Sequence, residues 1–309
     1  MMEKRIIPIV RQREIKNIIK RVQSPIPKVN ICKQAQEIAI KNSELQKSNL
    51  IKSQQIKFVP KIIQNHARSI KPNRTNVQNV SPAIKDYNYN KLMSIKNSGS
   101  GQILVMIACG PSANEVDFLP LKGKNNIKIM IINKPISYIW PVDYWAFCDH
   151  SQYVRNKVDF DNYNGLLINS VGVKAKKPNQ VLIKAIQGKG FNPDIINGYF
   201  IGRSSVYANM QTALFMNFDK IFIFGIDMCA VDGKTHHYGN GFNPDVAPDL
   251  RIQRFEHEAA HYSGAGNILS EDVRKKFYFC SSYNQWPFTN KFNKWDHKDA
   301  VAKILEIAK

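Results

Sequence analysis

The sequence predicts an α/β protein in which a Rossmann-like, mostly parallel sheet carries helices on both faces. Short apolar segments of strand length recur between residues 102 and 280, which is typical of strands buried on both sides. Segments with helical apolar spacing lie between several of them. Several strand segments end in Gly, Ser, Asn or Asp, and ligands of such sheets bind beyond the carboxyl ends of the strands.

The predicted strands begin with the apolar segment 102–108, which runs directly into a turn at Gly110. The segment 221–227, Ile-Phe-Ile-Phe-Gly-Ile-Asp, has the clearest strand pattern, because it combines β-branched and aromatic residues. In chain order, we predict strands at residues 102–108, 127–133, 143–149, 165–169, 181–183, 221–227 and 276–280.

Three helices alternate with the later strands. The first spans residues 204–217, where apolar side chains fall on one face and Ser204 or Ser205 can cap the first turn. The other two span residues 248–262 and about 297–308.

The first hundred residues differ from the rest in charge and glycine content. They carry a net charge of +15 out of +20, and no glycine precedes Gly99. We therefore predict a basic, Gly-free N-terminal arm over residues 1–98, partly helical or disordered, and a Rossmann-like domain over residues 99–309. The Asn-Ser-Gly-Ser-Gly stretch at 97–101 has the composition of a flexible linker. A basic arm attracts anions, so its expected partner is nucleic acid or an anionic membrane surface.

Composition excludes several classes of protein. No apolar run reaches 18 residues, which argues against a transmembrane helix, and the N-terminus has no apolar signal segment. The five cysteines are odd in number and form no C-x-x-C pair, which argues against a disulfide framework and a zinc ribbon. We expect a cytoplasmic protein, in the host cytoplasm if viral, that can lie at an anionic surface. The Lys-, Asn- and Ile-rich usage is typical of an AT-rich phage or bacterial genome.

The turn after the first strand is a candidate phosphate site. Gly110 would let a ligand approach the backbone, Pro111 follows it, and the Ser112 hydroxyl can donate to a phosphate. This Gly-Pro-Ser turn is neither a G-x-G-x-x-G fingerprint nor a Walker A motif, which excludes the standard dinucleotide and P-loop motifs.

A second candidate anion site precedes the helix at 204–217. Its sequence is Gly202-Arg203-Ser204-Ser205. The first-turn N–H groups and the helix dipole favour an anion, and Arg203 adds a permanent positive charge. The alternative is a glycine turn followed by an ordinary N-cap.

Polar residues at other strand ends offer acid–base chemistry. Asn133, Asp149 and Asp227 could contact a ribose or a metal ion. His236 and His237 lie in a polar loop just beyond a strand end, where either could act as a general base or acid.

One motif indicates different chemistry. His257-Glu258-Ala-Ala-His261 matches the zincin pattern H-E-x-x-H, in which both histidines bind zinc and the glutamate is the general base. The third ligand of the longer metzincin pattern would fall on Asn267, and the flanking residues are polar. The alternative is a surface helix with solvated side chains.

Six segments, taken in order, resemble a known group of enzymes. They lie at residues 105–117, 133, 141–149, 202–227, 232–236 and 278–282. Their order and spacing are similar to those of family-42 sialyltransferases and of the 6-hydroxymethylpterin diphosphokinase-like family, which includes the bacterial motility accessory factors linked to flagellin glycosylation. The resemblance covers about residues 105–285. Arg203 departs from it, since the relatives usually carry a small residue there.

The resemblance implies a Rossmann-like catalytic domain that binds a nucleotide or nucleotide-sugar. The residues that it places around the nucleotide are Gly110, Pro111, Ser112, Asn133, Asp149, Gly202, Arg203, Ser204 and Ser205. The residues that it places in catalysis are His236, His237 and Asp227, with a histidine as the base on an acceptor hydroxyl.

Four functions remain open at this point. The leading hypothesis is a glycosyltransferase that uses a nucleotide-activated sugar, such as a CMP-linked acidic sugar, on an unknown acceptor and requires no cofactor. A diphosphokinase on the same fold would transfer pyrophosphate from ATP and require Mg²⁺. A non-enzymatic nucleic-acid or virion-associated protein would bind through the basic arm. A zinc metalloprotease would use the H-E-x-x-H motif.

Overall fold

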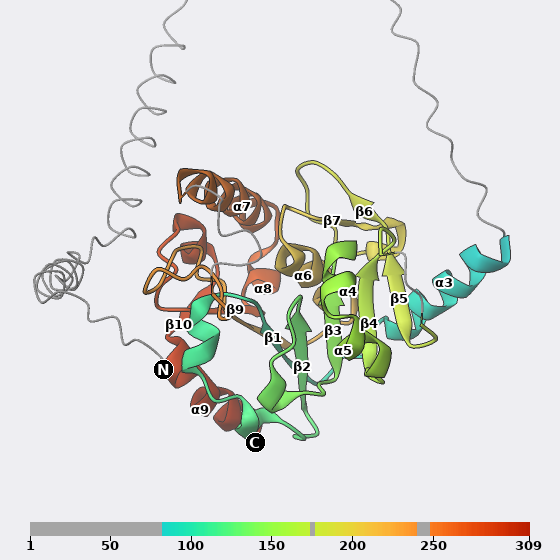
Figure 1. Cartoon of the computed structure of the whole chain (residues 1–309), viewed down its shortest axis with the longest axis horizontal. Helices are drawn as coiled ribbons and strands as arrows, with labels where there is room; N and C mark the ends of the chain where they lie inside the picture. Colours follow the sequence, from blue (N-terminus) through green and yellow to red (C-terminus); the bar gives the residue numbers. More distant parts are fainter. Residues whose placement is uncertain (1–81, 174–176, 240–247) are drawn as a thin grey trace, which may run out of the picture.

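The computed structural model describes residues 82–173, 177–239 and 248–309, and these form an α/β fold built on one large sheet (Figure 1). The sheet has eight strands in the order β10-β9-β8-β1-β2-β3-β4-β5, and every neighbouring pair is parallel. The predicted Rossmann-like fold class is therefore confirmed. Residues 1–81, which hold most of the predicted arm, lie outside the described residues.

All seven predicted strands are present, and three others were not predicted. The strands of the sheet are β1 (Ile103–Ile107), β2 (Ile127–Ile132), β3 (Tyr144–Phe147), β4 (Leu166–Ser170), β5 (Gln180–Ile183), β8 (Lys220–Phe224), β9 (Phe277–Cys280) and β10 (Asn293–Trp295). A separate pair consists of β6 (Ala185–Ile186) and β7 (Tyr199–Phe200). The unpredicted strands are short, and β10 is a polar edge strand, so none has an apolar run.

The three predicted helices are also present. The helices within the described residues are α3 (Pro82–Ile95), α4 (His150–Arg155), α5 (Lys157–Asn162), α6 (Ser205–Phe215), α7 (Pro248–Ile268), α8 (Glu271–Arg274) and α9 (His297–Ile307). Helix α6 begins one residue later than predicted, and the expected serine cap is wrong, because Ser204 precedes the helix without a side-chain cap hydrogen bond. Helix α7 continues past the predicted end at 262. No helix within the described residues is both long enough and apolar enough to cross a membrane.

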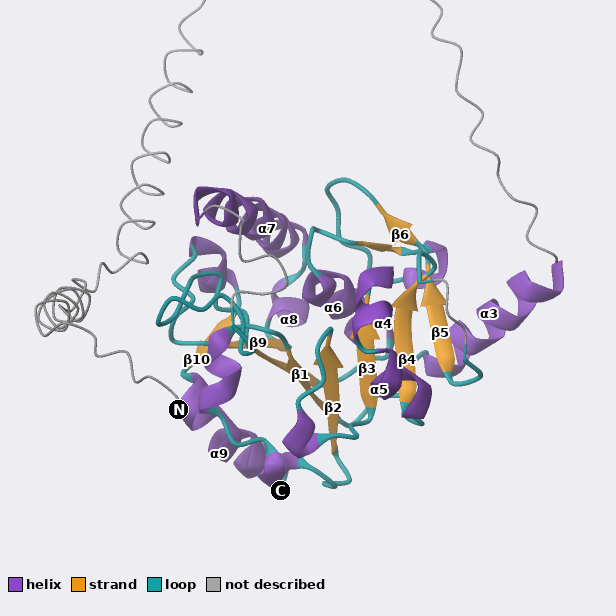
Figure 2. Cartoon of the chain, viewed as in Figure 1, coloured by secondary structure: helices purple, strands orange, loops and turns teal. Residues whose placement is uncertain are grey.

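The sheet divides the core into two apolar layers. Leu104 and Met106 of β1 pack in the layer that includes α6 and α7, whereas Val105 and Ile107 pack in the layer that includes α9. Figure 2 shows α6 and α7 on one side of the strands and α9 on the other. Because successive strand residues point to opposite faces, a strand covered on both faces must be apolar throughout, as β1 is.

The strand order contains one reversal, between β1 and β8. From β1 the chain adds β2 to β5 on one side, and β8, β9 and β10 lie on the other. Ligands of doubly wound sheets bind beyond the carboxyl ends of the strands at such a reversal.

The connection from β1 to β2 has no α-helix. It contains two short 3₁₀ helices, Pro111–Glu115 and Leu119–Leu121. The buried Phe118 packs edge-on against Phe224 of β8, with ring centroids 5.0 Å apart. The helix whose N-terminus holds the phosphate in the standard dinucleotide fold is thus replaced here by a tight, packed loop.

The expected linker is part of the folded domain. Leu92 and Ile95 of α3 are buried in the same core layer as α6, and the Gly99 N–H donates to the Met216 carbonyl at 2.7 Å. A Cβ atom at Gly99 would lie 2.7 Å from the Phe218 ring. Glycine at this position therefore allows close packing, and the expectation of a flexible linker at residues 97–101 is corrected.

Helix α3 also pairs with the edge strand β5. The Asn88 side chain donates from Nδ2 to the Leu182 carbonyl at 2.8 Å and accepts the Leu182 N–H on Oδ1 at 3.1 Å. One amide side chain thus forms the two hydrogen bonds that a neighbouring strand would form at this residue. In Figure 1, α3 lies beside β5 at the far end of the sheet from β10.

Candidate functional site

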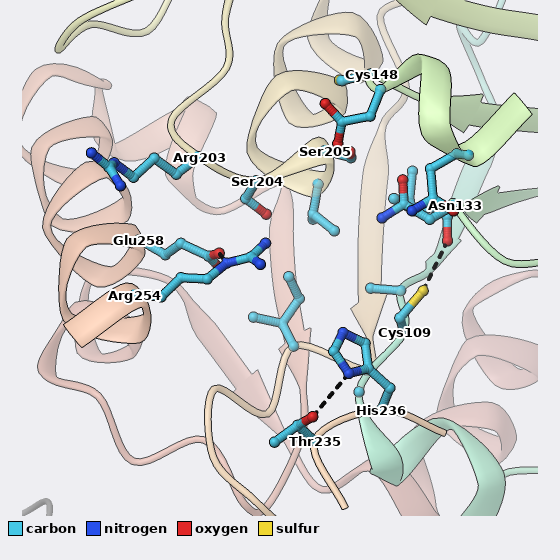
Figure 3. Close-up of a pocket in the computed structure, with 18 of the residues that line it drawn as sticks. Cys109, Asn133, Cys148, Arg203, Ser204, Ser205, Thr235, His236, Arg254 and Glu258 are labelled. Atoms are coloured by element: carbon cyan, nitrogen blue, oxygen red, sulfur yellow. Dashed lines mark hydrogen bonds and ion pairs between the residues drawn. The ribbon is translucent and has the colours of Figure 1, made fainter. Parts of the chain in front are cut away.

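A cavity of about 620 Å³ opens at the carboxyl edge of the sheet, where the strand order reverses (Figure 3). Its volume lies within the range of small-molecule sites, roughly 300–1,000 Å³. The lining residues that follow strand ends are Cys109 and Gly110 after β1, Asn133 after β2, Cys148 and Asp149 after β3, and Gly225 and Asp227 after β8.

The structure gathers most of the predicted site residues around this cavity. Those that line it are Gly110, Asn133, Asp149, Arg203, Ser204, Ser205, Asp227 and His236. Those that do not are Pro111, Ser112, Gly202 and His237. The parallel topology explains the agreement, because it brings the carboxyl ends of all these strands to one edge.

The floor of the cavity is made of two interlocked loops. A Cβ atom on Gly110 would lie 2.6 Å from Asp227 Oδ2, and one on Gly225, at φ +70°, would lie 2.6 Å from the Ala108 carbonyl oxygen. The Gly110 N–H donates to the Gly225 carbonyl at 2.8 Å. Gly110 therefore makes room for the loop after β8, whereas the sequence suggested that it makes room for a ligand.

Asp227 fastens these loops together. Its buried carboxylate accepts the Ser112 N–H at 2.8 Å, the Ser112 hydroxyl at 2.6 Å and the Ser281 hydroxyl at 2.5 Å. Three segments, after β1, β8 and β9, thus meet at one carboxylate. Both Ser112 donors are used inside the protein, so Ser112 has a structural role here. The catalytic role expected of Asp227 stays a prediction.

The N-terminus of α6 forms one wall. Gly202 and Arg203 both have positive φ, +53° and +60°, and turn the chain into Ser204. The Ser204 hydroxyl lies 3.2 Å from the Tyr262 hydroxyl and does not cap the helix. The first-turn N–H groups of α6 therefore have no side-chain cap, and Ser204, Ser205 and Val206 line the cavity. A helix start in this state attracts an anion.

Three arginines from three elements border the cavity: Arg155 at the end of α4, Arg203 before α6, and Arg254 on α7. Arg254 Nε lies 2.9 Å from Glu258 Oε1. Burial raises the pKa of Glu258, and the nearby Arg254 opposes this rise. Arg155 and Arg254 were not predicted, because each is a single residue on a helix, outside any motif.

Two buried acceptor atoms in the cavity wall have no hydrogen-bond partner among the described residues. They are Oδ1 of Asn133 and Oε1 of Gln152. Asn133 adopts φ +65°, in the left-handed region that non-glycine residues seldom enter. A buried carbonyl oxygen without a donor is costly, and a ligand that brings an N–H or O–H donor to either atom would remove that cost. Gln152 was not predicted, because nothing in its sequence context marks it.

His236 points into the cavity from the loop beyond β8. Its Nδ1 lies 3.0 Å from Thr235 Oγ1, and its ring stacks on Tyr238 at 5.1 Å. In Figure 3, Arg203 and Arg254 lie on one side of the cavity, Asn133 lies on the other, and the His236 ring projects between them. The acid–base role predicted for His236 is compatible with this position and stays a prediction.

His237 is turned away from the cavity. Its backbone N–H donates to the Cys109 carbonyl at 2.7 Å, which holds the loop against the end of β1. Burial, together with the nearby His236 and Lys134, lowers the pKa of His237 to about 4. The two candidate histidines thus differ in position: His236 lines the cavity, whereas His237 holds its loop against β1.

The H-E-x-x-H residues do not converge on one site. Glu258 lines the large cavity, His261 lines a separate cavity beside Tyr207, and His257 is exposed. Within residues 82–173, 177–239 and 248–309, no three His, Cys, Asp or Glu side chains form a cluster that could hold a metal ion.

Comparison of the chain with protein-family models, curated proteins and solved structures finds no match.

Proposed function

We propose that this protein is a glycosyltransferase that takes its sugar from a nucleotide-activated donor bound in the cavity between β1 and β8. The main support is that three arginines and the uncapped start of α6 face the same cavity as His236. Displacing a nucleotide from a sugar requires fixed positive charge beside the nucleotide phosphate and a base beside the acceptor hydroxyl, both in the same cavity.

In this proposal the donor phosphate lies at the start of α6. There the first-turn N–H groups can donate to phosphate oxygens, and Arg203 and Arg254 can form charge-assisted hydrogen bonds to them. The nucleoside extends toward Asn133 and Gln152, whose orphaned carbonyl oxygens accept its hydroxyl or amino hydrogens.

His236 then acts as the general base. In this proposal Nδ1 carries a proton toward Thr235 Oγ1, 3.0 Å away, and Nε2 takes the proton of the acceptor hydroxyl. As the acceptor oxygen bonds to the sugar carbon, its proton passes to Nε2. The bond from that carbon to the phosphate oxygen breaks, and the arginines stabilise the negative charge on the departing nucleotide.

A nucleotide-binding experiment tests the first half of the proposal. The melting temperature of the full chain is measured with CMP, CDP, UDP, GDP and ATP, each with Mg²⁺ and with EDTA. A ligand at 100 times its Kd adds about 2.7 kcal/mol of stability, which raises the melting temperature visibly. Stabilisation in EDTA by one nucleotide is expected and would identify the donor class. If no nucleotide stabilises the protein, the proposal fails and the non-enzymatic alternative gains support.

Donor turnover tests the second half. We expect His236→Gln to slow release of the nucleotide from its sugar conjugate by about 10²–10⁴-fold, while binding of the conjugate changes little. The matched control is His257→Gln, since that exposed histidine lies outside the cavity. Equal rates for both variants would remove His236 from the mechanism.

A second candidate is a Mg²⁺-dependent diphosphokinase on the same site. The observation that favours it is the exposed Asp149 in the cavity wall, because Mg²⁺ in phosphoryl-transfer sites is held by one or two carboxylates and the substrate phosphates. Stabilisation by ATP that requires Mg²⁺ and is lost in Asp149→Asn would support this candidate against the glycosyltransferase.

A further inference from the structure

Three polar side chains that the proposed glycosyl transfer does not use form a hydrogen-bonded chain beyond the end of β9. The Ser282 hydroxyl lies 3.0 Å from His297 Nδ1, and His297 Nε2 lies 3.3 Å from Glu115 Oε2. The three residues come from separate segments: the 3₁₀ helix after β1, the turn after β9 and the start of α9. The fold has thus brought together a hydroxyl, an imidazole and a carboxylate in that order.

The neighbouring contacts define the direction of the hydrogen bonds. The Ser282 backbone N–H also approaches Nδ1, at 3.4 Å, which makes Nδ1 the acceptor, and Asp296 Oδ1 lies farther from the same nitrogen, at 3.6 Å. The proton of the neutral ring then sits on Nε2 and is donated to the Glu115 carboxylate. Ser282 can therefore donate its hydroxyl proton to Nδ1, and the resulting imidazolium would face a carboxylate on its other nitrogen. This is the arrangement of a nucleophile, a base and an orienting acid, with the two ring nitrogens in reversed roles.

Glu115 is held in its ionised form by several donors. The Tyr283 hydroxyl donates to Oε1 at 2.7 Å, and Lys298 Nζ lies 3.3 Å from Oε2. Partial burial opposes ionisation, but the contacts with Tyr283, His297 and Lys298 outweigh it and lower the pKa of Glu115. A carboxylate that stays negative can stabilise a positive imidazole beside it.

The chain of bonds is not needed to begin α9. Asp296 already caps this helix, because its Oδ1 accepts the Lys298 N–H at 2.9 Å. The burial pattern also suits a reactive serine. His297 has 0% exposed surface, whereas Ser282 is only partly buried, so Ser282 is the residue of this pair that borders solvent.

We propose that Ser282 is a nucleophile activated by His297, with Glu115 as a positioning residue, and that it accepts an acyl group from an activated carboxylic ester. The Ser282 oxygen bonds to the carbonyl carbon while its proton moves to Nδ1. The carbon–oxygen bond to the leaving group then breaks. The leaving group of an activated ester departs as an anion, the proton stays on the imidazole beside Glu115, and the acyl group stays on Ser282. This site shares no residue with the proposed donor cavity, so it stands independently of the glycosyltransferase.

A covalent probe tests the proposal on the full chain. A fluorophosphonate reacts with activated serines: the serine oxygen bonds to phosphorus, fluoride leaves, and the proton passes to the base. The labelled residue is located by peptide mass spectrometry. We expect Ser282 to be labelled at least ten-fold faster than the exposed Ser137, which serves as an internal control in the same molecule.

Variants then separate activation from packing. Glu115→Gln is expected to slow labelling of Ser282 at least ten-fold at an unchanged melting temperature, and Ser282→Ala to abolish the label. A burst of one equivalent of p-nitrophenol from p-nitrophenyl acetate is expected from the wild type and from Ser137→Ala, but not from Ser282→Ala. Labelling of Ser282 no faster than Ser137 in the wild type would overturn the proposal without reference to any variant. An unchanged labelling rate in a folded Glu115→Gln would overturn the role of the carboxylate.

Discussion

The Asp227 carboxylate accepts both the backbone N–H and the hydroxyl of Ser112, at 2.8 and 2.6 Å, at the point where the loops after β1 and β8 meet. One buried side chain thereby joins the two sides of the switch point. The shape of the cavity depends on this contact, because Gly110 and Gly225 lie directly beside it.

We predict that Asp227→Asn lowers the free energy of unfolding by about 2–4 kcal/mol. The amide is neutral and turns an NH₂ group toward serines that act as donors, so at least one buried hydrogen bond is lost. Urea unfolding measures the change. Asp161→Asn is the control: it breaks an exposed ion pair with Lys157 and should cost less than about 0.5 kcal/mol. Equal losses of unfolding free energy in the two variants would contradict a stabilising role for the Asp227 carboxylate between the two loops.

We expect Arg203 to lower the stability of the folded protein and to strengthen nucleotide binding. Its φ of +60° is strained for a residue with a side chain, by about 1–2 kcal/mol, and glycine relieves that strain at a cost of roughly 0.5–1 kcal/mol in chain entropy. Arg203→Gly should therefore unfold at the same or a higher temperature, yet bind the nucleotide at least about ten-fold more weakly, since a charge-assisted bond is lost.

Lys124→Ala is the matched control for that variant, because it removes one positive charge from an exposed position outside the cavity. Calorimetric titration with the nucleotide identified by thermal shift measures both affinities. Unchanged affinity in Arg203→Gly would exclude this guanidinium from the phosphate site.

His237 should make stability depend on pH. Its pKa is lowered to about 4 in the folded protein by burial, against about 6.5 in the unfolded chain, so the unfolded state binds more protons between these values. The stabilisation is complete above pH 6.5 and is lost as the pH falls toward 4. Between pH 7 and pH 5, the wild type should lose about 1–2 kcal/mol more than His237→Gln in urea unfolding. If the unfolding free energies of the wild type and His237→Gln change in parallel with pH, His237 is not the source of the pH dependence.

Helix α3 should contribute to the stability of the domain. Leu92 is 3% exposed within the core layer of α6, so Leu92→Ala should lower the free energy of unfolding by about 2–4 kcal/mol. Tyr89→Ala, at a half-exposed site on the same helix, should cost less than about 1 kcal/mol. Similar small losses in both variants would mean that α3 is not part of the cooperative unit.

The strands were predictable because burial on both faces demands an apolar run, and β1 and β8 are such runs. Helix α3 was not predicted, since only Leu92 and Ile95 of its described side chains are buried and most of the others are polar. The expectation of a flexible linker at Gly99 was wrong because glycine occurs both in flexible segments and where chains pack closely. The sequence does not show that the Phe218 ring packs against Gly99.

In the site, residues at strand ends were predictable because topology alone brings them together. Their orientations were not. Ser112 and His237 lie just beyond strand ends, as Asn133 and His236 do. Ser112 is nevertheless held away from the cavity by its hydrogen bond to Asp227, and His237 by its backbone hydrogen bond to Cys109. Arg155, Gln152 and Arg254 were missed because helix residues face a cavity only through the way in which their helices pack.

The pairing of Asn88 with Leu182 has a consequence for the behaviour of the protein in solution. An exposed edge strand recruits strands from other molecules, and β5 would offer its central N–H and C=O to any such partner. The Asn88 amide occupies both groups, so it acts as a guard against edge-to-edge aggregation. A variant that lacks residues 1–98 would lose Asn88, and we expect it to aggregate, with light scattering that rises with protein concentration. In the full chain, Asn88→Ala should show the same effect more weakly.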